Sequence, residues 1–291
     1  MSKSKPPVEV SNVKESSSKV HYKDFFCGWG AACISITITY PINKLIFRQI
    51  LSSSSVYTAL KEMYHEGIFQ LYRGIFPPLM QKTFSLSIMF GVYEEVRRPL
   101  MEKSNINPYG AKMIAGLTAG TMEAILMPFE RIQTLLVDTT YNNRFKNTFH
   151  AFKIVGTNYG IRECYRGLIP ILFRNGPSSV CFFVLRDEFH IYIHKSNSVL
   201  GQKLSEFFCG ALIGVLISGI FFPLNVLKVH MQSQIGGEFQ SLYQGVKQVY
   251  QRGGTIKNFY YGVQVSMIRS FFGWGIVNAA YEYLRSSLKN F

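Results

Sequence analysis

Residues 204–227 read LSEFFCGALIGVLISGIFFPLNVL, an apolar run that contains Pro223. Two further apolar runs contain an equivalent proline, and Pro41, Pro128 and Pro223 lie 87 and 95 positions apart. Each proline is followed by a corner that begins with an aromatic residue and ends in glycine, at residues 72–74, 165–167 and 260–262. Self-similarity at a nearly fixed period indicates tandem copies of one structural unit. The chain is therefore predicted to contain three such units.

Six segments with at most one charged side chain each flank the polar middles of the three units. They cover residues 25–42, 75–93, 113–129, 168–185, 204–227 and 263–281. Each approaches the ~20 apolar residues that cross a bilayer as a helix. We predict an all-α membrane protein with six transmembrane helices, over residues 23–51, 75–102, 110–138, 169–194, 203–232 and 264–288. Shorter amphipathic surface helices are predicted over residues 56–65, 146–158 and 242–251.

The first helix of each unit is expected to bend and to pack closely. Proline removes a backbone donor and clashes with the preceding turn, so each of the three prolines is expected to bend its helix. Small residues four positions apart allow helices to approach closely in lipid. They occur in pairs at Gly28 and Ala32, Gly116 and Gly120, and Gly210 and Gly214.

Composition argues against several other classes of protein. The formal net charge is +14, but the basic residues are scattered and form no nucleic-acid-binding motif, so membrane lipid is the expected partner and nucleic acid is not. Residues 1–21 form a polar tail without the apolar core of a secretory signal. The sequence contains no P-loop, His-Glu-x-x-His motif or nucleophile elbow, so we expect neither an enzyme nor a bound cofactor or metal.

Three cations occupy nearly the same depth in the second helix of each unit. Lys82, Arg174 and Arg269 lie nine or ten residues beyond the three corners, and we call them the cation cluster. A charge near the bilayer centre is costly, so such residues face water or a ligand and predict an anion site. Glu123 adds a negative group; the alternative is that Glu123 only pairs with Lys82 or Arg174 for structure. An anion with a cationic end, such as NAD+, fits this set, and Phe90 or Phe173 is a candidate for stacking on its ring.

The chain resembles the mitochondrial carrier family. That family has Pro-x-acidic-x-x-basic on the odd-numbered helices, and here the matching stretches are residues 41–46, 128–133 and 223–228. The resemblance implies carrier repeats over residues 22–104, 105–198 and 199–291 of one integral domain, folded as a pseudo-threefold barrel whose short helices lie on the matrix side. It further implies a monomeric multi-pass transporter of the mitochondrial inner membrane that works by alternating access.

The resemblance also implies a substrate site and two gates. Substrate contacts fall on the cation cluster and Glu123, joined by Gln81 and Asn175. The matrix gate comprises Asn43, Glu130, Gln133, Asn225, Lys228 and Gln232. The cytoplasmic gate comprises Glu94, Arg97, Asp187, His190, Glu282 and Arg285.

The matrix gate of this chain is predicted to be weak. Glu130 and Lys228 are the residues there that can form an ion pair between repeats. Asn43 and Gln133 are expected to share a hydrogen bond, and Asn225 to face Ile46 without a charged partner. Gln232 is expected to brace the gate.

The transported compound is expected to be NAD+. Residues 71–82, 130–136, 165–175 and 233–241 resemble members of the family that transport NAD+. The Arg174-Asn175 pair is also similar to that of keto-acid carriers, so a carrier of a keto acid, another carboxylate or a nucleotide is the alternative. A transport-inactive scaffold is a third reading, which the eroded matrix gate favours and the charges of the substrate site oppose. The resemblance also implies cardiolipin at the Tyr-Arg-Gly corners, where helix N-termini offer backbone donors.

Overall fold

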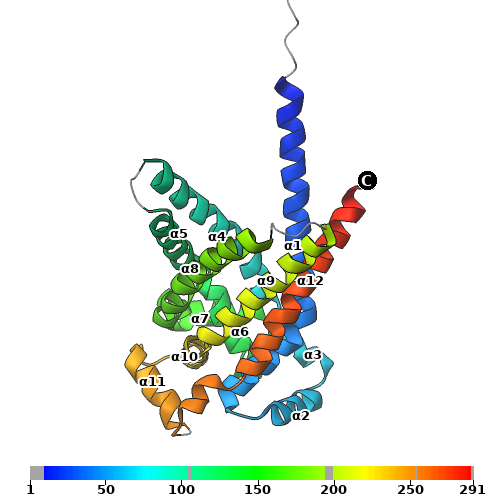
Figure 1. Cartoon of the computed structure of the whole chain (residues 1–291). Helices are drawn as coiled ribbons and strands as arrows, with labels where there is room; N and C mark the ends of the chain where they lie inside the picture. Colours follow the sequence, from blue (N-terminus) through cyan, green and yellow to red (C-terminus); the bar gives the residue numbers. More distant parts are fainter. Residues whose placement is uncertain (1–9, 104–106, 194–198, 253, 290–291) are drawn as a thin grey trace, which may run out of the picture.

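The computed structural model describes residues 10–103, 107–193, 199–252 and 254–289, and within them the regular elements are helical (Figure 1). Repeat 1 contains α1 (Val10–Ser52), α2 (Val56–Glu66), α3 (Ile68–Leu71) and α4 (Phe76–Lys103). Repeat 2 contains α5 (Pro108–Met122), α6 (Met127–Val137), α7 (Thr148–Tyr159) and α8 (Leu168–Ile193). Repeat 3 contains α9 (Val199–Ile220), α10 (Phe222–Ser233), α11 (Leu242–Gln251) and α12 (Val263–Lys289). Short 3₁₀ turns cover Glu123–Leu126, Thr139–Tyr141, Ile161–Tyr165 and Ile256–Tyr260.

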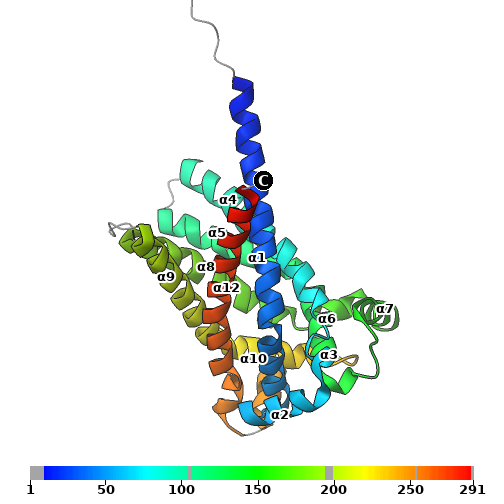
Figure 2. The ribbon, with the colours of Figure 1, turned by 90° about the vertical axis from the view of Figure 1, so that its right-hand side faces the viewer.

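The long helices pack in chain order around one bundle. α4 packs on α5, α5 on α8, α8 on α9 and α9 on α12, and α12 closes the bundle against α1. The surface helices α2 and α11 lie at the bottom of Figure 1, at the end opposite the C-terminus and the projecting part of α1. Figure 2 shows α7 on the outer side of α6, likewise away from that projecting end. The predicted six-helix bundle with three short surface helices is confirmed.

The prolines interrupt two of the three odd-numbered helices. α9 and α10 meet at Phe221 with a bend of 59°. In repeat 2 the 3₁₀ turn Glu123–Leu126 separates α5 from α6, and Pro128 then lies in the first turn of α6. Pro41 instead lies inside the continuous helix α1 and does not interrupt it. The hydroxyls of Thr37 and Thr39 donate to the carbonyls of Cys33 and Ser35, four residues earlier on the same helix.

Helix α1 begins at Val10, well before the predicted residue 23. Residues 10–22 contain neither proline nor glycine, so no helix breaker separates them from the apolar part of α1. The expected polar tail is therefore helical over much of its length.

Hydropathy alone identifies fewer spans than the bundle contains. By length and composition, Phe26–Ser52 and Ile161–Phe189 would each cross a membrane, and the bent pair Phe207–Ile220 and Phe222–Ser233 would count as a third. This count covers the described residues. Helices such as α4 and α12 fall outside it because side chains such as Lys82 and Arg269 lower the mean hydropathy of an otherwise apolar stretch.

Arginines of the corners join neighbouring repeats at the end that carries the surface helices. Arg73 donates to Asn142 Oδ1 at 2.7 Å and to the Phe145 carbonyl at 2.6 Å. Arg166 donates to the carbonyls of Gly236 and Gly237 at 2.9 and 2.8 Å. The chain turns at each corner through a glycine with φ of 83°, 84° or 92°, a conformation that favours glycine (Gly74, Gly167 and Gly262). Repeat 3 carries Tyr261 where the other corners carry arginine.

Candidate functional site

Glu130 joins side chains from all three repeats at the centre of the bundle. Its Oε1 accepts a hydrogen bond from Gln81 Nε2 on α4 at 2.7 Å and lies 3.4 Å from Arg174 Nη2 on α8. Its Oε2 lies 3.3 Å from Lys228 Nζ on α10. One carboxylate therefore links helices of repeats 1, 2 and 3, and the predicted Glu130–Lys228 pair is confirmed.

The local sequence explains why Glu130 and Lys228 meet. Pro128 and Pro223 each lie in the first turn of a new helix, and Glu130 and Lys228 follow them two and five residues later, on α6 and α10. Their side chains are only 11% and 7% exposed. A buried ion pair holds when further hydrogen bonds satisfy its members, and Gln81 supplies one to Glu130.

Arg174 connects the predicted substrate site to the predicted matrix gate. Its Nε donates to Asn175 Oδ1 at 2.9 Å, and its Nη1 donates to Asn225 Oδ1 at 3.2 Å. Asn225 thus has a charged partner, contrary to the prediction that it has none. The guanidinium is long and forked enough to reach Glu130 and Asn225 together, which residue spacing along the chain does not reveal.

Of two other expectations for the matrix gate, the brace by Gln232 is present and the Asn43–Gln133 hydrogen bond is not. Gln232 Oε1 accepts a hydrogen bond from Thr134 Oγ1 at 3.0 Å, one helical turn beyond Glu130, so it braces α6 against α10 and does not bond the ion pair. Asn43 and Gln133 both lie in the described part of the chain, and their side chains share no hydrogen bond. The expected link between them is therefore absent in this conformation.

Lys82 and Arg269 are the members of the cation cluster that lack an anionic partner. Neither forms an ion pair or hydrogen bond with a described residue, and Arg269 Nε is buried without an acceptor. Lys82 lines a cavity of about 370 Å³ between α1 and α4, which we call the small cavity. Lys82 lies within electrostatic range of Arg269, and Arg269 within range of Arg174. Like charges held together away from bulk water attract an anion.

Glu123 stands beside this cluster without a cationic partner among the described residues. Ser85 Oγ donates a hydrogen bond to Glu123 Oε1. Neither Lys82 nor Arg174 forms an ion pair with Glu123 in the described part of the chain, although Lys82 lies within its electrostatic range. The alternative in which Glu123 serves as the structural partner of Lys82 or Arg174 is therefore not the arrangement that the structure adopts.

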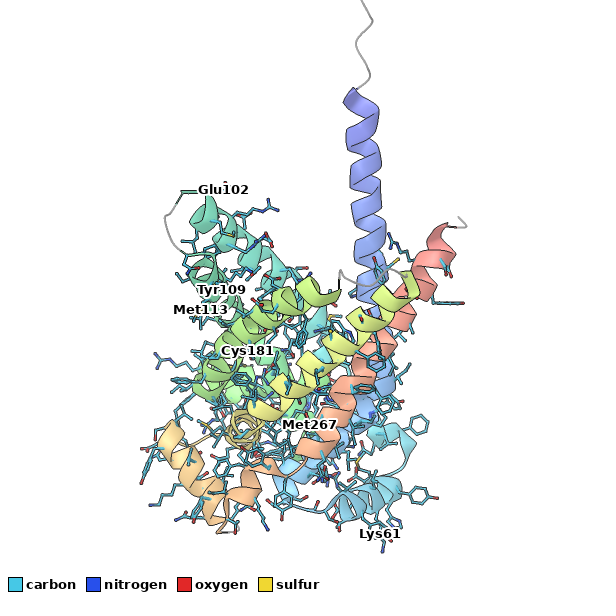
Figure 3. The ribbon with its side chains drawn as sticks, in the orientation of Figure 1. Lys61, Glu102, Tyr109, Met113, Cys181 and Met267 are labelled. Atoms are coloured by element: carbon cyan, nitrogen blue, oxygen red, sulfur yellow. The ribbon has the colours of Figure 1, made fainter. Side chains whose placement is uncertain are left out.

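A second, larger cavity lies between α4, α8, α9 and α12. It has a volume of about 1200 Å³, and we call it the large cavity; its lining includes Phe90, Arg186, Trp274, Asn278, Glu282 and Arg285. Figure 3 shows the side chains that fill the bundle, with Cys181 labelled on α8 and Met267 on α12. Phe90 lines both cavities, whereas Phe173 lines neither and is 59% exposed. Of the two candidate stacking residues, Phe90 is thus the one in contact with a cavity.

Three of the predicted cytoplasmic gate residues, Glu94, Arg97 and Asp187, form ion pairs within their own repeats. Glu94 pairs with Arg97 at 2.9 Å on the same helix, and Asp187 pairs with Lys112 at 2.8 Å within repeat 2. No ion pair of these three gate residues reaches another repeat in the described structure. Glu282 and Arg285 line the large cavity, and the side chain of His190 lies outside the described residues. The bundle is therefore latched at Glu130 and hollow toward the other end.

Sequence reasoning missed a buried charged group behind the matrix gate. Arg131 Nη2 and Arg166 Nε both donate to Glu163 Oε1, at 2.9 and 2.8 Å. Arg131 also donates to the Gln234 carbonyl, and Glu163 accepts from the backbone N–H of Gly236 at 3.2 Å. The available signal was Arg131 next to Glu130 in a mostly apolar stretch, because an arginine there needs an acid elsewhere in the chain.

Comparison with known proteins agrees with this architecture. Residues 17–104, 106–197 and 202–291 each match the family described as mitochondrial carrier protein. A mitochondrial nicotinamide adenine dinucleotide transporter of Homo sapiens is 40% identical over 285 residues, with 96% of each chain covered. The transporter of the same description from Mus musculus is 40% identical over 286 residues, and a second one from Homo sapiens 39% over 285, each with 96% of both chains covered. The chain therefore belongs to the mitochondrial carrier family.

Proposed function

We propose that this protein imports NAD+ across the mitochondrial inner membrane into the matrix by alternating access. The observation that carries the proposal is the pair of unpartnered cations, Lys82 and Arg269, beside Glu123 at the centre of the bundle. Full-length similarity to mitochondrial nicotinamide adenine dinucleotide transporters supports the choice of substrate.

The charges of the site match those of NAD+. Arginine and lysine suit the oxygens of a pyrophosphate, arginine through paired N–H donors and lysine as a point charge. Glu123 offers its carboxylate to the nicotinamide cation or to hydroxyl donors, and Ser85 already holds one of its oxygens in place. A carboxylate substrate would satisfy the cations but would leave Glu123 without a role.

Substrate binding is coupled to the matrix gate through Arg174. In the latched state Arg174 divides its donors among Asn175, Asn225 and Glu130. A substrate phosphate that takes the Arg174 donors removes one of the three links of Glu130 and so weakens the latch. Binding shifts the conformation only to the extent that the substrate binds the opened state more tightly.

The corners are proposed to bind cardiolipin through backbone donors, in a protein that acts as a monomer. The side chains of Arg73 and Arg166 already donate to carbonyls of the neighbouring repeat. The N–H groups at the starts of α4 and α8 are the remaining donors at these corners, and helix N-termini favour phosphate.

Uptake of labelled NAD+ into liposomes that contain the purified protein tests the proposal, with a keto acid and ADP compared in parallel. We expect saturable NAD+ uptake by the wild-type protein and at least a tenfold loss in Arg269→Gln, because the variant removes an unpartnered cation while keeping a polar side chain. Arg162→Gln, at an exposed position outside the bundle core, should retain uptake. Uptake of the keto acid without NAD+ would retain the carrier and discard the dinucleotide. No uptake of any compound by folded protein would favour the scaffold reading.

A further inference from the structure

The small and large cavities meet at one side chain. Phe90 lines the small cavity together with Lys82, and it lines the large cavity together with Arg186. Phe90 therefore lies between the two cavities, and a ligand bound at Lys82 would contact this ring before it reached the large cavity. The small cavity alone has about 370 Å³, against about 1200 Å³ for the large one.

The ring of Phe90 is held in place from behind. Phe183 meets it edge-on, with ring centroids 5.8 Å apart and planes at 87°. Phe183 is 2% exposed and stacks on Tyr93 with centroids 3.6 Å apart. Phe90 itself is 37% exposed. An aromatic ring with one fixed side and one open side is suited to stacking on a second planar group.

Arg186 adds a planar cation to this surface. Its guanidinium carbon lies 5.8 Å from the centroid of the Phe90 ring. Arg186 is exposed and forms no ion pair with a described residue. A guanidinium beside an aromatic face, with no acid to neutralise it, binds planar electron-rich rings by stacking and cation–π contact.

The distance between this surface and the cations suits a nucleotide. Eight residues of α4 separate Lys82 from Phe90, which corresponds to a rise of about 12 Å. On α12, Arg269 and Asn278 are nine residues apart, or about 13 to 14 Å. Asn278 also lines the large cavity and uses its amide N–H for the Trp274 carbonyl at 3.1 Å, which leaves its oxygen as an acceptor for an amino group.

We propose that Phe90 and Arg186 bind the base of one nucleoside of the substrate, while its phosphates lie at Lys82 and Arg269. This inference rests on the proposed function and adds a base-binding surface to it. The site is specific for a planar heteroaromatic ring attached to a phosphate through a sugar. It accounts for a large cavity that the phosphate contacts alone would leave empty.

The experiment compares Phe90→Leu with Phe84→Leu. Phe84 lies on the same helix, is 50% exposed and lines neither cavity, so it controls for loss of an aromatic ring from α4. NAD+ uptake into liposomes gives the half-saturation concentration, and inorganic pyrophosphate serves as a competitor that contacts the cations alone. A stacked base contributes about 5- to 150-fold in affinity. Phe90→Leu should raise the half-saturation concentration within that range and leave inhibition by pyrophosphate unchanged.

Arg269→Gln should instead weaken inhibition by pyrophosphate. Phe90→Trp should keep the affinity for NAD+. Arg186→Gln, at an exposed position, should lower that affinity. If Phe90→Leu does not fold, these two variants test the base-binding surface. Equal effects of Phe90→Leu and Phe84→Leu, or unchanged NAD+ affinity in both Phe90→Leu and Arg186→Gln, would overturn the base-binding surface alone. Absence of NAD+ uptake by the wild-type protein would overturn the proposed function, and the inference with it.

Discussion

At the residue scale, Glu130 carries an unusual share of the matrix gate. A single carboxylate receives Gln81, Arg174 and Lys228, one from each repeat. Removal of a buried charge that has several partners is more damaging than loss of one surface ion pair, because its partners stay buried and unneutralised.

Glu130→Gln should destabilise the latched state by about 3 to 5 kcal/mol, since Lys228 and Arg174 then lack their carboxylate. The thermal unfolding temperature in detergent measures this loss. Glu62→Gln provides the matched control, because Glu62 pairs with Arg48 at 3.0 Å but is 46% exposed, and Arg48 keeps Glu66 as a second partner, so the loss should be about 0 to 1 kcal/mol. Equal unfolding temperatures for the two variants would show that Glu130 is not the centre of the latch.

The part of the candidate site that could be predicted is the contact set by the spacing of residues along the repeats. Glu130 and Lys228 each follow a helix-starting proline, so repeat symmetry brings them together. The Arg174 link to Asn225 was not predictable, because it depends on how far a long side chain of α8 reaches across to α10. The same holds for Gln81, whose amide turns to Glu130.

At the element scale, α2 is fastened to α1 by a cluster around Glu66. Lys44 Nζ lies 3.2 Å from Glu66 Oε2 and donates to the Gln70 carbonyl at 2.6 Å, and Arg48 also bonds Glu66. Burial acts to raise the pKa of the Glu66 carboxyl, but the Arg48 hydrogen bond and the Lys44 and Arg48 charges outweigh it and hold the pKa below its usual value of 4.5. Folding therefore favours the ionised form of Glu66.

A lowered carboxyl pKa in the folded state stabilises the fold above the unfolded pKa, and this contribution disappears as pH falls through the folded value. Wild-type protein should therefore exceed Glu66→Gln in unfolding temperature at pH 7, with the difference shrinking below about pH 4.5. Thermal unfolding in detergent across this range checks the sign. A difference that stays constant down to pH 3 would assign the effect to packing of the side chain.

The existence and approximate position of the long helices could be predicted, because each apolar segment carries at most one charged side chain and is bounded by polar residues. The sequence left the course of α1 undetermined at two places. Pro41 lies in a helix that continues, whereas Pro128 and Pro223 lie in the first turn of a new helix, although the three prolines occupy the same place in the repeat. Residues 10–22 lack the apolar pattern from which a helix would be predicted, so the start of α1 at Val10 was not foreseen.

At the scale of the whole molecule, the three seams between repeats differ at the matrix end. Polar links between repeats 2 and 3 include Arg166 with the carbonyls of Gly236 and Gly237, and Tyr141 Oη with the Ser233 carbonyl at 2.9 Å. The seam between repeats 3 and 1 is mainly apolar; its cluster includes Leu45, Ile46, Ile50, Phe222, Val226 and Leu227. Arg252 adds a hydrogen bond to the Leu51 carbonyl at 3.2 Å.

Opening toward the matrix should therefore separate repeat 1 from repeat 3 while repeats 2 and 3 move together. Apolar surfaces slide without breaking directional bonds, whereas the polar seam must lose several at once. Spin labels at exposed Lys61 on α2, Lys153 on α7 and Tyr243 on α11, in a background without native cysteines, report the three distances. Addition of NAD+ should change the Lys61–Tyr243 distance more than the Lys153–Tyr243 distance. Equal changes at all three seams would indicate a symmetric opening.

The charges near the centre have an electrical consequence. Lys82, Arg174, Lys228 and Arg269, set against Glu123 and Glu130, leave two net positive charges, and NAD+ carries one net negative charge, so loading halves the net charge of the site. The membrane potential, negative in the matrix, then acts less on the loaded step than on the empty site, which it holds inward. Each elementary charge that crosses the full field is worth about 2.3 kcal/mol per 100 mV. The return of the empty carrier, rather than the delivery of NAD+, is then the step that an energised membrane slows.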